Sequence, residues 1–186
     1  MVSSIGLLRF FLRLFKSPIY KLRRNRIHIT SDVDSGTFVR NCIVGRYCYI
    51  GRNCVLNSVE IENYTCIASG VQIGGMEHSI NDLSISPTLM GEKCKLGEKT
   101  YIGHDVWIAA NCIIKQGVKI GDGAIVGANS FVNKDVEPYS IVFGSPAKFY
   151  KYRPCLEYKE IIDKSKYWTY PPIKARKVLK DIEGEK

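Results

Sequence analysis

Residues 96–136 read LGEKTYIGHDVWIAANCIIKQGVKIGDGAIVGANSFVNKDV, and this stretch repeats its pattern every six residues. An aliphatic residue marks each step: Leu96, Ile102, Ile108, Ile114, Ile120, Val126 and Val132. The next position is small or turn-prone, with Lys115 as the exception, and the fourth position after each aliphatic is small or β-branched. This period is typical of a parallel β-helix, in which each short strand stacks on its equivalent one coil below.

The same period runs less regularly through the earlier part of the chain. We place on it Phe38, Val44, Ile50 and Leu56, and then, after one five-residue step, Ile61, Ile67 and Ile73. Between residues 74 and 95 the period stops, and the segment reads GGMEHSINDLSISPTLMGEKCK. An insertion in a repeat protein forms a loop on one face, where function often resides. We therefore expect a β-helix over residues 30–147 with an inserted loop at 74–95.

Charge is concentrated at the two ends of the chain. Residues 1–29 carry seven basic residues and no acid, the repeat body 30–147 carries nine basic against twelve acidic, and residues 148–186 carry eleven against six. Basic ends can meet phosphate, nucleic acid or an anionic membrane, although a solvated surface explains them equally well. The tail 148–186 is expected to be a helical extension, with helices over about 156–164 and 173–179.

The first segment, 1–29, is basic and amphipathic. Arg9, Arg13 and Lys16 share one helical face, and the other positions of residues 4–16 are mostly Leu, Phe and Ile. The segment is too short and too charged to span a bilayer, and it lacks the apolar core of a signal peptide. Two roles stay open: residues 1–16 contact a membrane surface, or they cap the open first coil.

The seven cysteines do not form a disulfide or zinc pattern. Four of them occupy the small position of the repeat, where a thiol acts as a small buried hydrophobe: Cys42, Cys48, Cys54 and Cys112. A six-residue spacing is not that of zinc ligands, and disulfide frameworks belong to short secreted chains. The cysteine usage predicts a reducing cytoplasm.

Few residues offer chemistry. The sequence has no GxSxG, P-loop, dinucleotide fingerprint or metal cluster, so group transfer would proceed by direct attack of the acceptor, assisted by a base. Of the three histidines, His78 in the inserted loop is the candidate base, because histidine exchanges protons near neutral pH. His104 is expected at an exposed corner, and His28 precedes the predicted repeats.

A second candidate site lies near the end of the repeats. Small residues at Ala110 and Ala128 leave room for a slender chain along the coils, and Lys134, Lys148 and Lys151 supply positive charge. This layout suits a pantetheine arm that ends in phosphates. A solvated surface would explain the lysines as well.

Four stretches carry a resemblance to a known family: Ile102–Ala109, Ile120–Ser130, Lys134–Ile141 and Gly144–Lys148. Together they resemble the hexapeptide-repeat acyltransferases over roughly residues 30–153. The loop, with His78 followed by SISP at 84–87, is similar to the branch of xenobiotic acetyltransferases and polysaccharide O-acetyltransferases.

The resemblance implies a left-handed β-helix, a homotrimer with active sites between subunits, and acetyl-CoA as donor without a metal. It makes His78 the catalytic base, and it implies coenzyme contacts from Ala110, Ala128, Asn133, Lys134, Lys148 and Lys151. The chain departs from the family pattern at Ala109, where glycine is usual, and at Asn133, where threonine is usual. The loop also lacks the His-Pro step of the galactoside and maltose enzymes.

These observations predict an acetyl-CoA-dependent O-acetyltransferase that modifies a sugar hydroxyl in cell-surface polysaccharide synthesis. The expected location is the cytoplasm, with peripheral membrane contact through residues 1–16 as an open alternative, and no nucleic-acid partner is expected. Alternatives are a xenobiotic acetyltransferase, N-acetylation of an amino sugar, or a non-catalytic β-helix scaffold.

Overall fold

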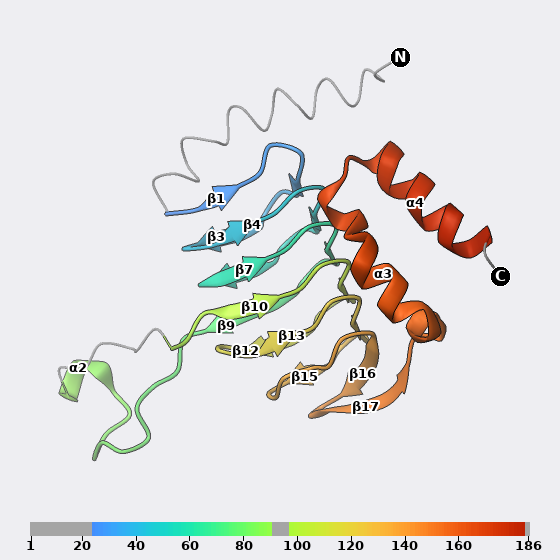
Figure 1. The fold of residues 1–186 in the computed structure, drawn as a ribbon. Helices are drawn as coiled ribbons and strands as arrows, with labels where there is room; N and C mark the ends of the chain where they lie inside the picture. Colours follow the sequence, from blue (N-terminus) through green and yellow to red (C-terminus); the bar gives the residue numbers. More distant parts are fainter. Residues whose placement is uncertain (1–23, 91–96, 185–186) are drawn as a thin grey trace.

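The structure, a computed structural model, describes residues 24–90 and 97–184. The predicted parallel β-helix is confirmed: three sheets of parallel strands form the sides of a prism, and one antiparallel strand is added at the end of one sheet (Figure 1). Sheet A contains β1 (Arg26–Ile27), β4 (Ile43–Val44), β7 (Val59–Ile61), β10 (Thr100–Ile102) and β13 (Lys119–Ile120). Sheet B contains β2 (Asp32–Val33), β5 (Tyr49–Ile50), β8 (Cys66–Ile67), β11 (Trp107–Ile108), β14 (Ile125–Val126), β16 (Ser140–Gly144) and β17 (Ala147–Tyr152). Sheet C contains β3 (Phe38–Arg40), β6 (Val55–Asn57), β9 (Gln72–Gly75), β12 (Ile113–Lys115) and β15 (Phe131–Val132).

The period-six aliphatic residues form the core because the register places each above its equivalent. In sheet B, for example, Ile50, Ile67, Ile108 and Val126 lie in one column and are fully buried. The four cysteines of the small position are buried beside them, as predicted. Removal of these apolar side chains from water is the main favourable contribution to folding of the stack. Each coil buries its side chains against the coils directly above and below it.

The expected place of Phe38 on the core period is wrong. Val39 is buried at 1% exposure, whereas Phe38 is 40% exposed on the outside of sheet C. The step from Val39 to Val44, the next aliphatic residue of the period, is therefore five residues, so this coil is shortened like the coil between Leu56 and Ile61. The prism also starts earlier than residue 30, because β1 begins at Arg26 and pairs with β4.

The prism has three corners, which we name by the sheets they join: A–B, B–C and C–A. Many corner residues adopt positive φ, the backbone region that favours Gly and Asn. The B–C corner follows this rule with Gly36, Asn53, Gly70, Asn111 and Asn129. The A–B corner instead holds three tyrosines in this region, Tyr47, Tyr64 and Tyr139.

The C-terminal tail covers the A–B corner and packs on two of its tyrosines, Tyr64 and Tyr139. After β17, which runs antiparallel to β16, the chain forms η1 (Pro154–Tyr158), α3 (Lys159–Ser165), η2 (Tyr167–Thr169) and α4 (Pro172–Gly184). Tyr139 packs under this tail with Ile162, Tyr167 and Ala175. A bulky residue at positive φ costs about 1–3 kcal/mol, and burial of the ring against the tail offsets that strain.

The inserted loop leaves the C–A corner after β9 and carries the short helix α2 (Pro87–Met90). It projects on the side of the prism opposite to the C-terminal helices (Figure 1). The three corners therefore differ: one is covered by the tail, one carries the loop, and the B–C corner carries small residues. The basic amphipathic segment proposed for residues 1–16 lies outside the described residues.

Candidate functional site

His78 lies at the start of the inserted loop with its side chain exposed. Its Nδ1 is 2.9 Å from the carbonyl oxygen of Ile85, across the loop. Because a carbonyl oxygen only accepts hydrogen bonds, Nδ1 donates and carries the ring proton. The neutral imidazole therefore keeps its lone pair on Nε2, which is the form that can take a proton from an acceptor.

The base of the loop is tied to the prism by an ion pair that the sequence did not reveal. Glu77 Oε1 lies 3.3 Å from Lys115 Nζ, on β12 of the coil below. The backbone of Lys115 also pairs with Gly75 at a register shift between β9 and β12. In the sequence, Lys115 is the one exception to the small or turn-prone residues that follow each aliphatic residue of the repeat over residues 96–133. This exception is the sequence feature that could have pointed to the ion pair.

A shallow hollow of about 370 Å³ continues from this ion pair along the C–A corner. Asn133 and Lys134, which follow β15 at the end of sheet C, line it together with Lys115 of β12 and Glu77, which follows β9. Two of the residues implied to contact coenzyme, Asn133 and Lys134, therefore lie on the same corner as the root of the His78 loop.

Ala110 and Ala128 lie on a different corner, B–C. They occupy equivalent places in successive coils, and the backbone N–H of Asn129 donates to the carbonyl oxygen of Ala110 at 2.9 Å. Lys148 and Lys151 stand on β17, whose hairpin with β16 ends the prism. The structure thus divides the sequence-predicted residues of one chain into two groups: His78, Asn133 and Lys134 on C–A, and Ala110, Ala128 and the hairpin lysines on the B–C side.

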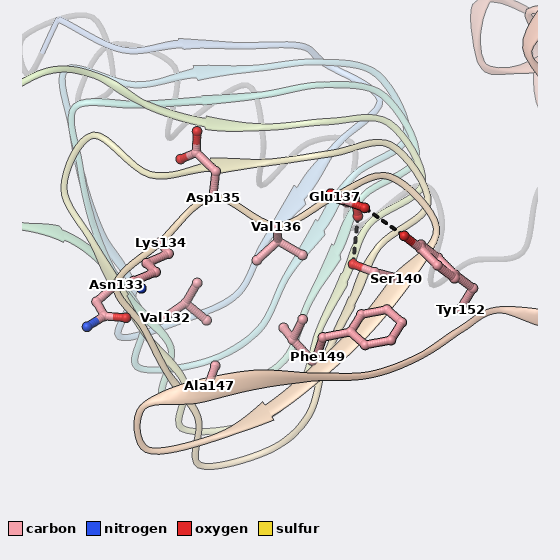
Figure 2. Close-up of a pocket in the computed structure, with 11 residues that line it drawn as sticks. Val132, Asn133, Lys134, Asp135, Val136, Glu137, Ser140, Ala147, Phe149 and Tyr152 are labelled. Atoms are coloured by element: carbon pink, nitrogen blue, oxygen red, sulfur yellow. Dashed lines mark hydrogen bonds between the residues drawn. The ribbon is translucent and has the colours of Figure 1, made fainter.

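The last coil is open at its end, which leaves a cavity of about 420 Å³. Figure 2 shows the residues that line it. Val132, Val136 and Val142 of the last coil line it, and Ala147 and Phe149 of β17 cross it as a strap. At its rim Tyr152 Oη donates to Glu137 Oε2 at 2.7 Å, and Ser140 Oγ donates to the carbonyl oxygen of Glu137 at 2.7 Å.

His104 lies at a corner, A–B, as expected, but the expectation that its side chain is exposed is wrong. Its ring stacks on Trp168 of the tail with centroids 4.9 Å apart, and its Nδ1 accepts the backbone N–H of Asn63 at 3.1 Å. The side chain is 17% exposed. His104 thus helps to dock the tail on the A–B corner, far in the fold from the His78 loop.

The buried cysteines are inert, as their place in the repeat predicts. Burial raises the pKa of the Cys48 thiol to about 11 and also raises the pKa of Cys42, Cys54 and Cys112. A protonated thiol is neither a nucleophile nor a metal ligand at neutral pH. Within residues 24–90 and 97–184, no group of three or more His, Cys, Asp or Glu side chains is arranged to hold a metal ion.

The chain matches the family model described as bacterial transferase hexapeptide (six repeats) over residues 99–134. A Lysinibacillus sphaericus protein named as a macrolide acetyltransferase is 38% identical over 59% of this chain and 68% of its own length. An Escherichia coli K12 protein named as a lipopolysaccharide biosynthesis O-acetyl transferase is 30% identical over 81% of this chain and 86% of its own length. The chloramphenicol acetyltransferase of Morganella morganii is 44% identical, but the match spans only 38% of its length.

Solved structures have the same fold. A maltose O-acetyltransferase from Clostridium difficile 630 superposes with a TM-score of 0.62 at 26% identity, over 74% of each chain. A hexapeptide-repeat acetyltransferase from Vibrio cholerae gives a TM-score of 0.59 at 28% identity, over 81% of this chain and 89% of that one. The Vibrio cholerae protein has also been solved in complex with acetyl coenzyme A.

Proposed function

Because this chain belongs to the hexapeptide-repeat acetyltransferases, we propose that it transfers an acetyl group from acetyl-CoA to a sugar hydroxyl, with His78 as the base. The observation that carries the proposal is the hydrogen bond from His78 Nδ1 to the Ile85 carbonyl, because it leaves Nε2 as the acceptor of a proton. A scaffold protein has no need of a histidine held in one tautomer on an exposed loop.

The chemistry follows from that tautomer. Nε2 of His78 accepts the proton of the acceptor hydroxyl as its oxygen attacks the carbonyl carbon of the thioester. The new C–O bond forms, the C–S bond breaks, and the imidazolium returns its proton to the departing thiolate, which yields free coenzyme A and the acetyl ester. A positioned base of this kind contributes about 10²–10⁴-fold to the rate.

The donor is proposed to lie along the B–C corner. Ala110 and Ala128 present little side chain there, so the pantetheine arm can lie close to the backbone, and Lys148 and Lys151 stand at the end of the corner for its phosphates. Asn133 and Lys134 would contact the same coenzyme from the C–A corner of a neighbouring chain.

This division of the site between two corners supports a homotrimer. The base and the proposed donor path of one chain lie on different corners, so a cleft between adjacent chains would bring them together. The loop gives a second reason: Ile80, Leu83, Ile85 and Leu89 are 72–102% exposed in the single chain. Such a concentration of apolar side chains on one loop favours cover by a second copy.

The acceptor is proposed to be a sugar of a cell-surface glycan, and the E. coli relative that aligns over most of both chains supports this. Among the described residues no helix combines the length and apolar character that crossing a bilayer requires. We propose a cytoplasmic enzyme, with peripheral contact through residues 1–16 where the acceptor is lipid-linked.

The test is release of coenzyme A from acetyl-CoA in the presence of panels of oligosaccharides, sugar nucleotides, macrolides and chloramphenicol. We expect turnover with a saccharide acceptor and loss of that turnover in His78→Ala. Turnover with none of the panels, by a folded trimer that binds coenzyme A, would contradict the proposal.

Acetylation of an antibiotic is the second candidate function. The macrolide and chloramphenicol relatives are the more identical ones, at 38% and 44%, and their names favour this alternative. Turnover confined to macrolides or chloramphenicol would select it, and the proposed roles of His78 and the donor path would remain as described.

A further inference from the structure

Helix α4, on the side of the prism opposite to the inserted loop, has two unlike faces (Figure 1). Its apolar side chains pack into the cluster beneath the tail: Ala175, Val178, Leu179 and Ile182. Its other face is exposed and carries Ile173, Lys174, Arg176, Lys177 and Lys180. We propose that these five residues, here called the α4 basic face, bind the anionic surface of a lipid membrane. The proposal does not depend on acetyl transfer.

The helical period gathers the five side chains on one side. Ile173, Lys177 and Lys180 are spaced i, i+4 and i+7, so they form a single stripe along the exposed side of the helix. Lys174 and Arg176 lie on either side of that stripe. Ile173 is 89% exposed. The face therefore presents four positive charges around one uncovered aliphatic side chain.

The charges of α4 oppose the stability of the helix itself. The N-terminal end of a helix favours acidic side chains, yet the first turn has none, and Asp181 and Glu183 lie in the last turn. Arg176 and Lys180 are like charges at i, i+4, a destabilising spacing. Within residues 24–90 and 97–184, none of the four basic side chains forms an ion pair with a carboxylate. Contacts inside the described fold therefore do not account for them.

The neighbouring helix α3 shows the opposite arrangement. Glu160 lies in its first turn and Lys164 in its last turn. Lys159 Nζ pairs with Asp163 Oδ2 at 2.6 Å, with the i, i+4 spacing. An acid in the first turn, a base in the last turn and such a pair all stabilise a helix. The unfavourable pattern is thus specific to α4 and is not a general property of a basic tail.

The chemistry of the face fits an anionic lipid surface. Each Lys or Arg near such a surface gains favourable electrostatic energy, and a basic amphipathic helix can lie in the plane of the interface. The apolar side of α4 is already packed against the prism, so the contact is mainly electrostatic, with Ile173 as its one apolar anchor. Ile173 favours lipid over nucleic acid, because headgroups lie above acyl chains that can accept an aliphatic side chain, whereas a phosphate backbone cannot.

Stable anchoring of a protein at a membrane commonly takes two weak signals. The α4 basic face would supply one of them, and residues 1–16, proposed above to contact the membrane, would supply the other. Loss of either signal is then enough to lower vesicle binding strongly, which makes the face testable in the full chain.

The test is co-sedimentation of the full chain with vesicles that contain phosphatidylglycerol and phosphatidylcholine, compared with vesicles of phosphatidylcholine alone. We expect binding to the anionic vesicles only, and we expect it to weaken as salt is raised. A triple variant should weaken this binding about hundredfold: Lys174→Gln, Lys177→Gln and Lys180→Gln. Ile173→Ser should weaken it about tenfold, because it removes the apolar anchor and keeps every charge.

The matched control removes the same number of charges from exposed positions of the prism: Arg40→Gln, Arg52→Gln and Lys119→Gln. It should leave vesicle affinity within about threefold of wild type, since these side chains lie outside the contact. The melting temperature of the α4 triple variant should be unchanged or slightly higher, because the substitutions remove like-charge repulsion.

Four results would overturn the proposal. Unchanged vesicle affinity in the α4 triple variant would leave the membrane contact to other residues, and an equal loss in the prism control would reduce the effect to net charge. A lowered melting temperature in the α4 triple variant would show that the charges serve the fold. Tighter binding to double-stranded DNA than to the vesicles, insensitive to Ile173→Ser, would assign the face to nucleic acid. All of these measurements are made without an acetyl acceptor, so failure of the proposed function would leave them unaffected.

Discussion

At the scale of single residues, two histidines show how environment separates a proposed chemical role from a structural one. His78 is exposed, and its only described hydrogen bond fixes the tautomer with a free Nε2. His104 is mostly buried, and its Nδ1 is already occupied as the acceptor of the Asn63 N–H. The imidazole therefore has a free ring nitrogen, the proposed proton acceptor, in one place, and it holds the tail in the other.

We expect His78→Ala to lower kcat by about 10²–10⁴-fold at unchanged melting temperature, because the loop side chain contributes a proton acceptor and little packing. His104→Ala should do the reverse. Losing the ring contact with Trp168 and the bond from Asn63 should lower the free energy of unfolding by roughly 1–2 kcal/mol with turnover retained. Steady-state kinetics and urea unfolding of both variants measure the contrast, and more than about a third of wild-type kcat in His78→Ala would refute its role as base.

Cys48 supplies a prediction on pH. Burial raises the pKa of its thiol to about 11, above the value near 8.5–9 expected in the unfolded chain. The unfolded state therefore loses this proton first, and stability that is complete below pH 8.5 declines as pH rises to 11. We expect the decline attributable to this thiol to be roughly 3 kcal/mol, and Cys48→Ala, which leaves a small residue in the slot, to remove it. Parallel unfolding curves for wild type and variant between pH 8 and 11 would contradict this.

At the scale of elements, the loop and the strand beneath it form the unit that places His78. The Glu77–Lys115 ion pair is half-exposed, and pairs of this kind contribute about 0–1 kcal/mol to stability. We propose that the pair instead fixes the position of His78, because a shift of about 1 Å in a reacting group can lower the rate about a hundredfold.

We expect Lys115→Glu to lower kcat about tenfold without a change in melting temperature, and the exchange Glu77→Lys with Lys115→Glu to restore most of it. Lys99→Glu is the matched control, since Lys99 and Glu60 form a comparable exposed pair at 3.2 Å on sheet A. Equal effects of the two single variants on kcat, or no rescue by the exchange, would show that the loop does not depend on this pair.

The N-terminal segment is the second element with a testable role. The described prism begins with β1, β2 and β3, which are the terminal strands of the three sheets, so a cap at this end has backbone to cover. If residues 1–16 serve a membrane, their deletion should abolish co-sedimentation with anionic vesicles and leave the melting temperature nearly unchanged. A lowered melting temperature or aggregation would instead identify a cap. Failure of the intact protein to bind such vesicles at low salt would remove the membrane role.

At the scale of the whole molecule, the proposed function divides the site between corners of adjacent chains, and activity is then a property of the assembly. A His78→Ala chain keeps its donor corner, and a chain with Lys148→Glu and Lys151→Glu keeps its base. Each is expected to be nearly inactive alone, because every cleft of its trimer lacks one half.

Mixed trimers of the two variants should regain activity. If each cleft takes its base from one chain and its donor corner from the next, every mixed trimer contains one intact cleft. Random mixing of equal amounts during refolding or co-expression should then restore about a quarter of wild-type activity. Activity that stays at the level of the separate variants would place base and donor within the same chain.

The sequence by itself determined the kind of fold, because a six-residue period is a local spacing that any stacked coil must satisfy. It also located the inserted loop as an interruption of the period and four cysteines at the buried small position, and it selected His78 in that loop as the candidate base, which stays a prediction. It misplaced Phe38, since a one-residue shortening between Val39 and Val44 cannot be located where both neighbouring positions are apolar. Only the tertiary structure decided which residues share a corner, because that depends on coil count and on contacts between residues far apart in the chain. Glu77 meets Lys115, and His104 meets Asn63 and Trp168, only when the coils are stacked and the tail is docked.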